Sequence, residues 1–135
     1  MKKIILFTGL IISLGISWVV YAQNKAKSRT ETVTEYDKKA KKFITHKESY
    51  VIYNSNGDII EEYGYDKKGT VNKHIKTEYN SFGKKNKEIH YKDNTSAVKY
   101  IVEFVYDSRG LKTEELEKTA DGSKTTSKRV FTYGF

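Results

Sequence analysis

The chain has 135 residues, a length that suits one domain, and it contains no Cys and no Pro. These two absences exclude a disulfide framework, a thiolate metal site, a cysteine nucleophile and proline-rich linkers. A formal net charge of +8, from 25 Lys and Arg against 17 Asp and Glu, suits anionic polysaccharide, lipid headgroups or other cell-surface material. The same lysines also serve to protect exposed strand edges and keep the chain soluble.

Residues 1–22 have the layout of a secretory signal peptide. Two lysines follow the first Met, residues 4–20 are mostly apolar, and Val20 and Ala22 are small residues at a cleavage site before Gln23. We therefore expect export to the periplasm or the medium, and no nucleic-acid partner. In the alternative, the segment from Ile4 to Ala22 remains as an anchor, because it approaches the length of a bilayer span. The protein would then be a membrane-anchored periplasmic protein that touches the membrane only through this segment.

Residues 23–135 have the composition of an all-β chain. Ile, Val and Thr number 26 and the aromatic residues 15, whereas Ala, Leu and Met together number 6. β-branched and aromatic side chains suit a pleated sheet, and most strong helix formers are scarce. We expect a polar lead over residues 23–35 and a β-repeat domain over residues 36–135, with no helix.

A short phrase recurs along this domain: Tyr, then Asn or Asp, two variable residues, and Gly. The Asn or Asp side chain accepts hydrogen bonds from the turn backbone, and Gly takes a left-handed conformation at little cost. Each copy therefore predicts a type I hairpin turn closed by a Gly bulge. The turn residues of the phrase and its weaker copies include Asn54, Gly57, Asp66, Gly69, Asn80, Gly83, Asp107, Gly110, Asp121 and Gly122.

The spacing of the turns predicts how the strands are arranged. Gly57, Gly83 and Gly110 recur at nearly equal intervals, each long enough for two strands and the turn between them, so their turns should share one edge of a sheet. The pattern predicts an antiparallel β-meander of about seven or eight strands, either single-layered or curled.

Strand alternation then predicts one aromatic and aliphatic face and one charged face. The tyrosines assigned to the apolar face are candidates for stacking on a ligand, although the same rings would also serve as the core. These candidates are Tyr53, Tyr63, Tyr65, Tyr79, Tyr91, Tyr100 and Tyr106.

The charged face offers a candidate metal site. If Asn80 pairs with Lys84, the register places His74 opposite His90, and the preceding turn places Glu62 opposite His74. Three such side chains would lie about 5 Å apart, close enough to share a metal ion. The alternative is three solvated side chains, and on this alternative we expect neither a metal nor a cofactor.

Residues 63–69 (YGYDKKG) and 104–110 (FVYDSRG) resemble the Tyr-Asp (YD) repeats of bacterial Rhs proteins, and the resemblance extends over roughly residues 36–122. It implies an exported or surface-associated protein whose strips of β-sheet bind carbohydrate or contact cells. A fainter similarity is to small antitoxin-like proteins built from short β-repeats.

Motifs of catalysis are missing from the sequence: it has no nucleophile elbow, P-loop, His-Glu-x-x-His or EF-hand loop. Its strand carboxylates lie among lysines, and nothing indicates the apolar pocket that a glycosidase acid requires. We expect a non-enzymatic binding or structural protein of the bacterial envelope or exterior that contacts cell-surface saccharide or protein through its aromatic face. The alternative is a protein-binding inhibitor or immunity-type module that uses the same strip or an open edge strand.

Overall fold

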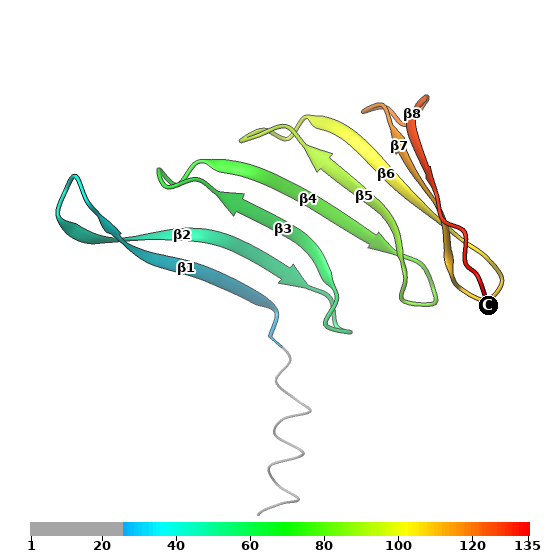
Figure 1. Cartoon of the computed structure of the whole chain (residues 1–135), viewed down its shortest axis with the longest axis horizontal. Coiled ribbons are helices and arrows are strands. Elements are labelled where there is room, and N and C mark those ends of the chain that lie inside the picture. The colour runs from blue at the N-terminus through cyan, green and yellow to red at the C-terminus, as the bar shows by residue number, and fades with distance from the viewer. Residues whose placement is uncertain (1–25) are drawn as a thin grey trace, which may run out of the picture.

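The computed structural model describes residues 26–135, which form one open sheet of eight antiparallel strands in chain order (Figure 1). This confirms the predicted all-β meander, and the described residues contain no helix. The signal-peptide prediction falls outside these residues. The strands are β1 (Ser28–Asp37), β2 (Lys42–Tyr53), β3 (Ile59–Tyr65), β4 (Val71–Tyr79), β5 (Lys85–Tyr91), β6 (Val98–Tyr106), β7 (Lys112–Lys118) and β8 (Thr125–Val130).

Within residues 26–135, no helical segment meets the length and apolarity needed to cross a bilayer.

The first strand begins earlier than the sequence indicated. β1 starts at Ser28 and pairs with β2 from Ser28↔Ile52 to Asp37↔Lys42, so most of the lead expected over residues 23–35 is a strand. Thr30, Thr32 and Thr34 alternate along it and supply the β-branched side chains that a strand prefers. Its polar composition suits an edge strand, which hydrogen-bonds on one side only.

The turns between strands are built from contacts between near neighbours in the chain. Asp66 Oδ1 accepts hydrogen bonds from the backbone N–H groups of Lys68 and Thr70, both at 2.8 Å. Gly69 donates its N–H to the Asp66 carbonyl and has φ +82°, a left-handed conformation that Gly adopts most readily. The same arrangement recurs at the turns that begin with Asn54, Asn80 and Asp107.

A β-bulge follows each hairpin turn from β2 to β8. In the β3–β4 pair, Tyr65 lies opposite Val71 but Gly64 lies opposite Lys73, so Asn72 has no cross-strand partner. An unpaired residue of this kind interrupts the alternation of side chains between the two faces. The unpaired residues of the six bulges are Ile60, Asn72, Asn86, Lys99, Thr113 and Thr126.

Because of these bulges, the prediction of one aromatic face and one charged face is wrong. Directly paired residues share a face, so Tyr63, His74 and Tyr91 lie on one side of the sheet, which we name face A. Val51 and Val102 lie on the other side, face B. Tyr65, which precedes an upper turn, joins face A, whereas the tyrosines that precede the lower turns, Tyr53, Tyr79 and Tyr106, join face B.

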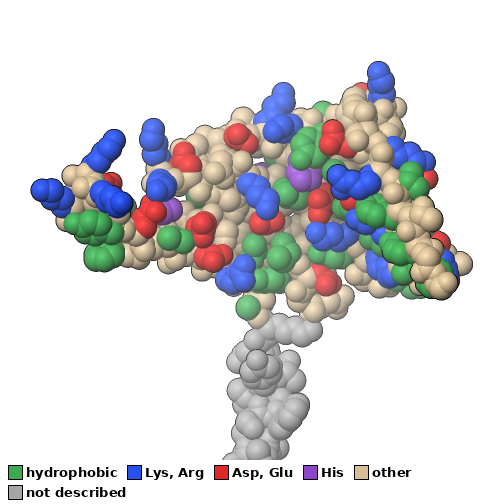
Figure 2. All heavy atoms as spheres, viewed as in Figure 1, with side chains coloured by type: hydrophobic (Ala, Val, Ile, Leu, Met, Phe, Trp, Pro, Cys, Tyr) green, Lys and Arg blue, Asp and Glu red, His purple; other side chains and the backbone are tan. Residues whose placement is uncertain are grey.

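The sheet is a single layer with almost no enclosed core. Among the described residues only Val51 and Val102 are buried hydrophobic side chains, at 2% and 9% exposure. Apolar, cationic and anionic side chains are interspersed over the face seen in Figure 2. The two rows of turns, separated by the strand length, form the upper and lower edges in Figure 1; we keep these names below. Contacts between neighbouring strands therefore supply most of the packing.

Candidate functional site

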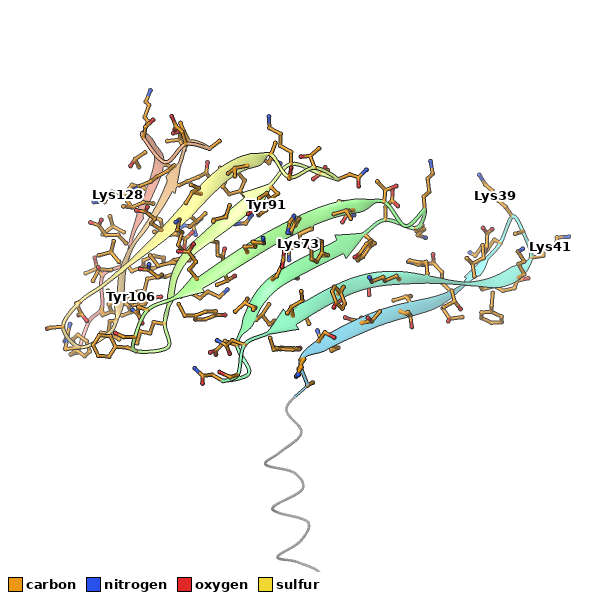
Figure 3. The ribbon with its side chains drawn as sticks, turned by 180° about the vertical axis from the view of Figure 1, so that it is seen from behind. Lys39, Lys41, Lys73, Tyr91, Tyr106 and Lys128 are labelled. Atoms are coloured by element: carbon orange, nitrogen blue, oxygen red, sulfur yellow. The ribbon has the colours of Figure 1, made fainter. Side chains whose placement is uncertain are left out.

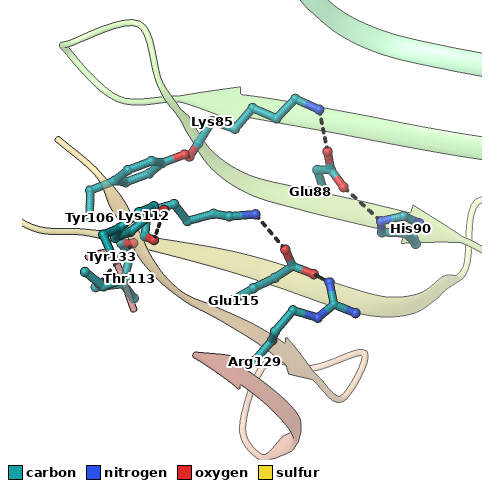
Figure 4. Close-up of polar contacts among 10 residues, drawn as sticks. Lys85, Glu88, His90, Tyr106, Lys112, Thr113, Glu115, Arg129 and Tyr133 are labelled. Carbon is teal, nitrogen blue, oxygen red and sulfur yellow. Dashed lines mark hydrogen bonds and ion pairs between the residues drawn. The ribbon is translucent and has the colours of Figure 1, made fainter. Parts of the chain in front are cut away.

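Tyrosines close the hairpins at the lower edge. Tyr79 and Tyr106 donate hydroxyl hydrogen bonds of 2.8 Å to the carbonyls of Ile59 and Lys85. Each acceptor begins the first strand of the hairpin that the tyrosine ends, and Tyr133 repeats the contact on Lys112. Figure 4 shows the Tyr106 hydroxyl beside Lys85. Tyr79 and Tyr106, expected to be ligand-binding residues, therefore have a structural role.

Face A carries a row of stacked rings across four strands. The His74 ring lies 4.3 Å from Tyr63 on one side and 4.3 Å from Tyr91 on the other, with interplanar angles of 13° and 17°. Tyr50 extends the row beyond Tyr63, with ring centroids 6.2 Å apart. Both ring faces of His74 are therefore covered, and Tyr63 and Tyr91 each have one ring face covered by it.

Glu61 links two members of this row. Its Oε1 accepts the Tyr63 hydroxyl at 2.7 Å and lies 2.7 Å from His74 Nε2. Partial burial and the hydrogen bond to Glu61 raise the pKa of Tyr63 to about 12. Partial burial opposes ionisation of Glu61, but the hydrogen bonds from Tyr63 and His74 and the charge of Lys76 outweigh it and lower the pKa of Glu61. The Tyr63 hydroxyl and His74 Nε2 therefore both have Glu61 as a hydrogen-bonding partner within the row.

Face B carries two sets of ion pairs, centred on Glu88 in β5 and on Glu115 in β7, at equivalent positions of the repeat. Glu88 lies 2.8 Å from Lys85 and 3.3 Å from His90, and Figure 4 shows the corresponding contacts around Glu115. There, Lys112 and Arg129 approach the carboxylate, each at 2.9 Å. Partial burial opposes ionisation of Glu88, but the contacts with Lys85 and His90 lower its pKa. Lys85 thus holds the Glu88 carboxylate, and Lys112 and Arg129 hold that of Glu115.

The register that would have built a metal site is wrong. Ile75, not His74, lies opposite His90, and Tyr63, not Glu62, lies opposite His74. The unpaired residues Asn72 and Asn86 shift each pairing by one position, which sends His74 to face A while Glu62 and His90 remain on face B. In the part of the chain that the structure describes, no three His, Cys, Asp or Glu residues gather to hold a metal ion.

A hollow with a volume of about 630 Å³ lies at the lower edge, between the turns at residues 80–83 and 107–110. Phe82 projects beside it with 85% of its surface exposed. Lys84 donates a hydrogen bond to the Gly110 carbonyl and lies 5.4 Å from the Tyr106 ring centroid. The lining residues are Asn80, Phe82, Lys84, Asn86, Phe104, Val105, Tyr106, Asp107, Ser108, Arg109 and Gly110.

The polar side chains that line this hollow differ in whether they already make hydrogen bonds. Asp107 accepts the backbone N–H groups of Arg109 and Leu111, and Arg109 pairs with it at 3.1 Å. The Leu111 N–H and the Arg109 hydrogen bonds outweigh desolvation and lower the pKa of Asp107. The exposed Asn86, by contrast, makes no side-chain hydrogen bond within residues 26–135. Aromatic rings and an unengaged amide that line one hollow can stack on a sugar ring and hydrogen-bond to its hydroxyls.

The expected ligand-binding tyrosines do not form one strip. Tyr63, Tyr65 and Tyr91 lie on face A. Tyr53, Tyr79, Tyr100 and Tyr106 lie on face B, and Tyr106 alone among all seven lines the lower-edge hollow. Sequence reasoning missed Phe82 and Asn86, because Phe82 occupies a variable turn position and Asn86 reads as an ordinary strand residue.

No model of a known protein family matches this chain, and no curated protein matches it significantly.

Proposed function

We propose that the chain is an exported, non-enzymatic β-repeat protein of the bacterial envelope or exterior that binds saccharide at the lower-edge hollow. The observation that carries this proposal is the exposed Phe82 ring beside the unengaged amide of Asn86, in a hollow of about 630 Å³. That volume suits one or two sugar rings. The resemblance to YD-repeat proteins, whose repeats are associated with carbohydrate and cell contact, supports the same reading.

The binding contacts follow from the chemistry of these side chains. The Phe82 ring is held on the turn that Asn80 and Gly83 form, and it presents a face to the apolar C–H surface of a sugar. Asn86 donates and accepts hydrogen bonds with vicinal hydroxyls. The Lys84 and Arg109 cations flank the hollow, but they are already engaged by the Gly110 carbonyl and the Asp107 carboxylate, so we expect a neutral saccharide.

The test is a glycan array probed with residues 23–135, followed by affinity measurements on any saccharide that binds. Phe82→Ala and Asn86→Ala should each weaken binding about tenfold or more. Phe43→Ala is the matched control, since Phe43 is another exposed aromatic residue, at 71% exposure, at the upper edge. Equal affinity in all three variants, or no saccharide ligand on the array, would contradict the proposal.

A protein-binding inhibitor or immunity-type module remains the second candidate, favoured by the last strand. All six residues of β8 are exposed, and β8 ends the sheet with one side unpaired by any described strand. A partner strand could extend the sheet there. Capture of one stoichiometric envelope protein that Phe82→Ala still binds would support this function over saccharide binding.

Export itself rests on the segment before Gln23. Amino-terminal sequencing of exported protein that begins at Gln23 would support cleavage of a signal peptide. Exported material that begins at Met1 and sediments with membranes would support the anchored alternative.

A further inference from the structure

The two edges of the sheet differ in charge. The upper-edge turns, residues 38–41, 66–70, 92–97 and 119–124, contain seven Lys and three Asp. The lower-edge turns, residues 54–58, 80–84 and 107–111, contain two cations and two Asp. Figure 2 shows Lys and Arg side chains projecting from the upper rim, and Figure 3 shows Lys39 and Lys41 pointing away from the sheet. The positive charge of the turns is therefore concentrated on one edge.

Six of the seven upper-edge lysines make no ion pair with the described part of the chain, unlike many lysines of the faces. Lys67 pairs with Glu35 at 2.5 Å, but the other six make no ion pair within residues 26–135. These six are Lys38, Lys39, Lys41, Lys68, Lys92 and Lys124. On the faces, by contrast, Lys73 and Lys112 have carboxylate partners at 2.8 and 2.9 Å.

The turn-forming aspartates of the upper edge do not neutralise these lysines. The Asp66 carboxylate accepts two backbone N–H groups of its own turn. Asp121 is held by Thr119 and Ser123, whose hydrogen bonds lower its pKa to about 2. Both carboxylates are held within their own turns but keep their charge, as does Asp93, so seven Lys against three Asp leave the upper turns with a net charge of +4 for an external anion.

The upper edge also has a hollow, which gives a ligand a concave surface beside the lysines. Its volume is about 480 Å³, and it lies between the first and second upper turns. Lys38 and Lys39 line it without a carboxylate partner in the described chain, and the half-exposed Tyr36 ring lies beside them. Glu35 and Asp37 also line it: Glu35 is paired with Lys67, and Asp37 accepts the backbone N–H groups of Lys39 and Ala40.

We infer that the upper edge binds a linear anionic polysaccharide laid across the four turns. Turns on one edge are separated by two strand spacings, about 10 Å, so the row extends about 30 Å from the first turn to the fourth. The proposal is separate from the lower-edge saccharide site, since the two edges lie at opposite ends of the strands.

The shape of the edge favours a polymer over a membrane. Neighbouring strands rotate by about 20–25° in a twisted sheet, and Figure 1 shows the strand direction turning steadily from β1 to β8. A flexible chain follows such an edge, whereas a flat bilayer touches only part of it. The exposed rings of the upper edge, Tyr36 and Phe43, both belong to the first hairpin, and the four upper turns themselves contain no apolar residue larger than Ala, so most of the edge offers nothing apolar to a lipid surface.

The experiment uses heparin fragments of increasing length as the probe. Affinity should rise with fragment length up to about 30 Å, and it should fall as salt screens the charges. A variant with Lys39→Gln, Lys68→Gln, Lys92→Gln and Lys124→Gln should bind at least tenfold more weakly. These side chains are exposed and unpaired within residues 26–135, so circular dichroism should show an unchanged fold.

The matched control removes four charges elsewhere: Lys27→Gln, Arg29→Gln, Lys76→Gln and Lys87→Gln. The last three make only long ion pairs, of 3.9, 3.6 and 3.5 Å. An equal loss of affinity in both variants, or none in either, would overturn the proposal. Binding to anionic phospholipid vesicles but not to heparin would overturn it in favour of a membrane surface. Phe82→Ala should leave heparin binding unchanged, which separates this test from that of the lower-edge site.

Discussion

The hydroxyl of Tyr106 donates a 2.8 Å hydrogen bond to the carbonyl of Lys85 and so joins the end of β6 to the start of β5. The β5–β6 hairpin is thereby held at both ends, by its turn at the upper edge and by this tyrosine at the lower edge. Tyr79 and Tyr133 make the same closure in the neighbouring hairpins. Because the sheet has no second layer packed against it, hydrogen bonds of this kind help to hold the ends of the strands together.

Removing one of these hydroxyls should lower stability. Tyr106→Phe keeps the ring and loses the hydrogen bond, so we expect a loss of about 1 kcal/mol in the free energy of unfolding. Urea denaturation followed by circular dichroism measures it. Tyr53→Phe is the control, since Tyr53 has the equivalent position but its hydroxyl makes no hydrogen bond in the described residues. Equal midpoints for the two variants would contradict a role for the hydroxyl.

The turn at Gly69 gives a test of backbone conformation. Gly69 has φ +82° and open space where a side chain would begin, so the cost of substitution is conformational. Gly69→Val should lose about 1–3 kcal/mol, and Gly69→Asn clearly less, because Asn94 already adopts φ +54° in the β5–β6 turn. Denaturant midpoints in the reverse order would contradict the turn assignment.

Gly64, inside strand β3, does not serve as a neutral comparison for that test. A Cβ at Gly64 would lie 3.0 Å from both Asn72 Oδ1 and Lys73 Cβ. Gly64→Ala should therefore also destabilise the sheet, by an amount that depends on how far the β4 bulge can shift.

Engineered disulfides test the register of β4 and β5. The pairing Ile75↔His90 implies that His74 faces Tyr91. In an antiparallel sheet, successive residue pairs such as 75/90 and 74/91 alternate between hydrogen-bonded and non-hydrogen-bonded sites. A non-hydrogen-bonded site places the two Cβ atoms about 4.5–5.5 Å apart. Double Cys substitution at 75 and 90, or at 74 and 91, should therefore oxidise readily in at least one case.

Cysteines at 74 and 90 should not form this bond, because those side chains point to opposite faces. The chain has no native Cys to interfere, so non-reducing electrophoresis and mass spectrometry report each pair directly. Preferential oxidation of the 74–90 pair would mean that the bulge at Asn86 is absent.

The pKa of Tyr63 makes stability depend on alkaline pH. Its pKa is raised from 10.0 to about 12 by partial burial and by the Glu61 carboxylate. A raised pKa favours the protonated folded state, so this contribution is fully present below pH 10 and is lost as pH rises toward 12. Burial also raises the pKa values of Tyr79 and Tyr100, so absorbance titration at the phenolate band should show several late-ionising tyrosines, of which Tyr63→Phe removes the one near 12. Glu61→Gln should bring that ionisation to lower pH, and an unchanged titration in both variants would contradict the assignment.

Local chemistry made the strands and their order predictable. At Asp66 and Gly69 every contact that shapes the turn joins near neighbours in the chain, so the phrase in the sequence is sufficient to place it. The phrase recurs along the chain at intervals of about one strand, and this spacing implied a meander, which the structure confirms. The edge strand β1 was missed because its alternation is carried by Thr and not by apolar residues.

The faces and the sites depended on pairing between strands. A strict alternation placed His74 with Glu62 and His90, but the unpaired residues Asn72 and Asn86 turn it to Tyr63 and Tyr91. The lower-edge hollow likewise joins Phe82 to Arg109, which belong to different hairpin turns and are distant in the chain.

The sequence by itself thus determined the all-β class, the turns and the chain-order topology, because hydrogen bonds between near neighbours control them. Only the tertiary structure decided which face each side chain occupies and which turns lie side by side. The physical reason is that one unpaired residue in a bulge costs little locally but reverses the facing of the side chains beyond it.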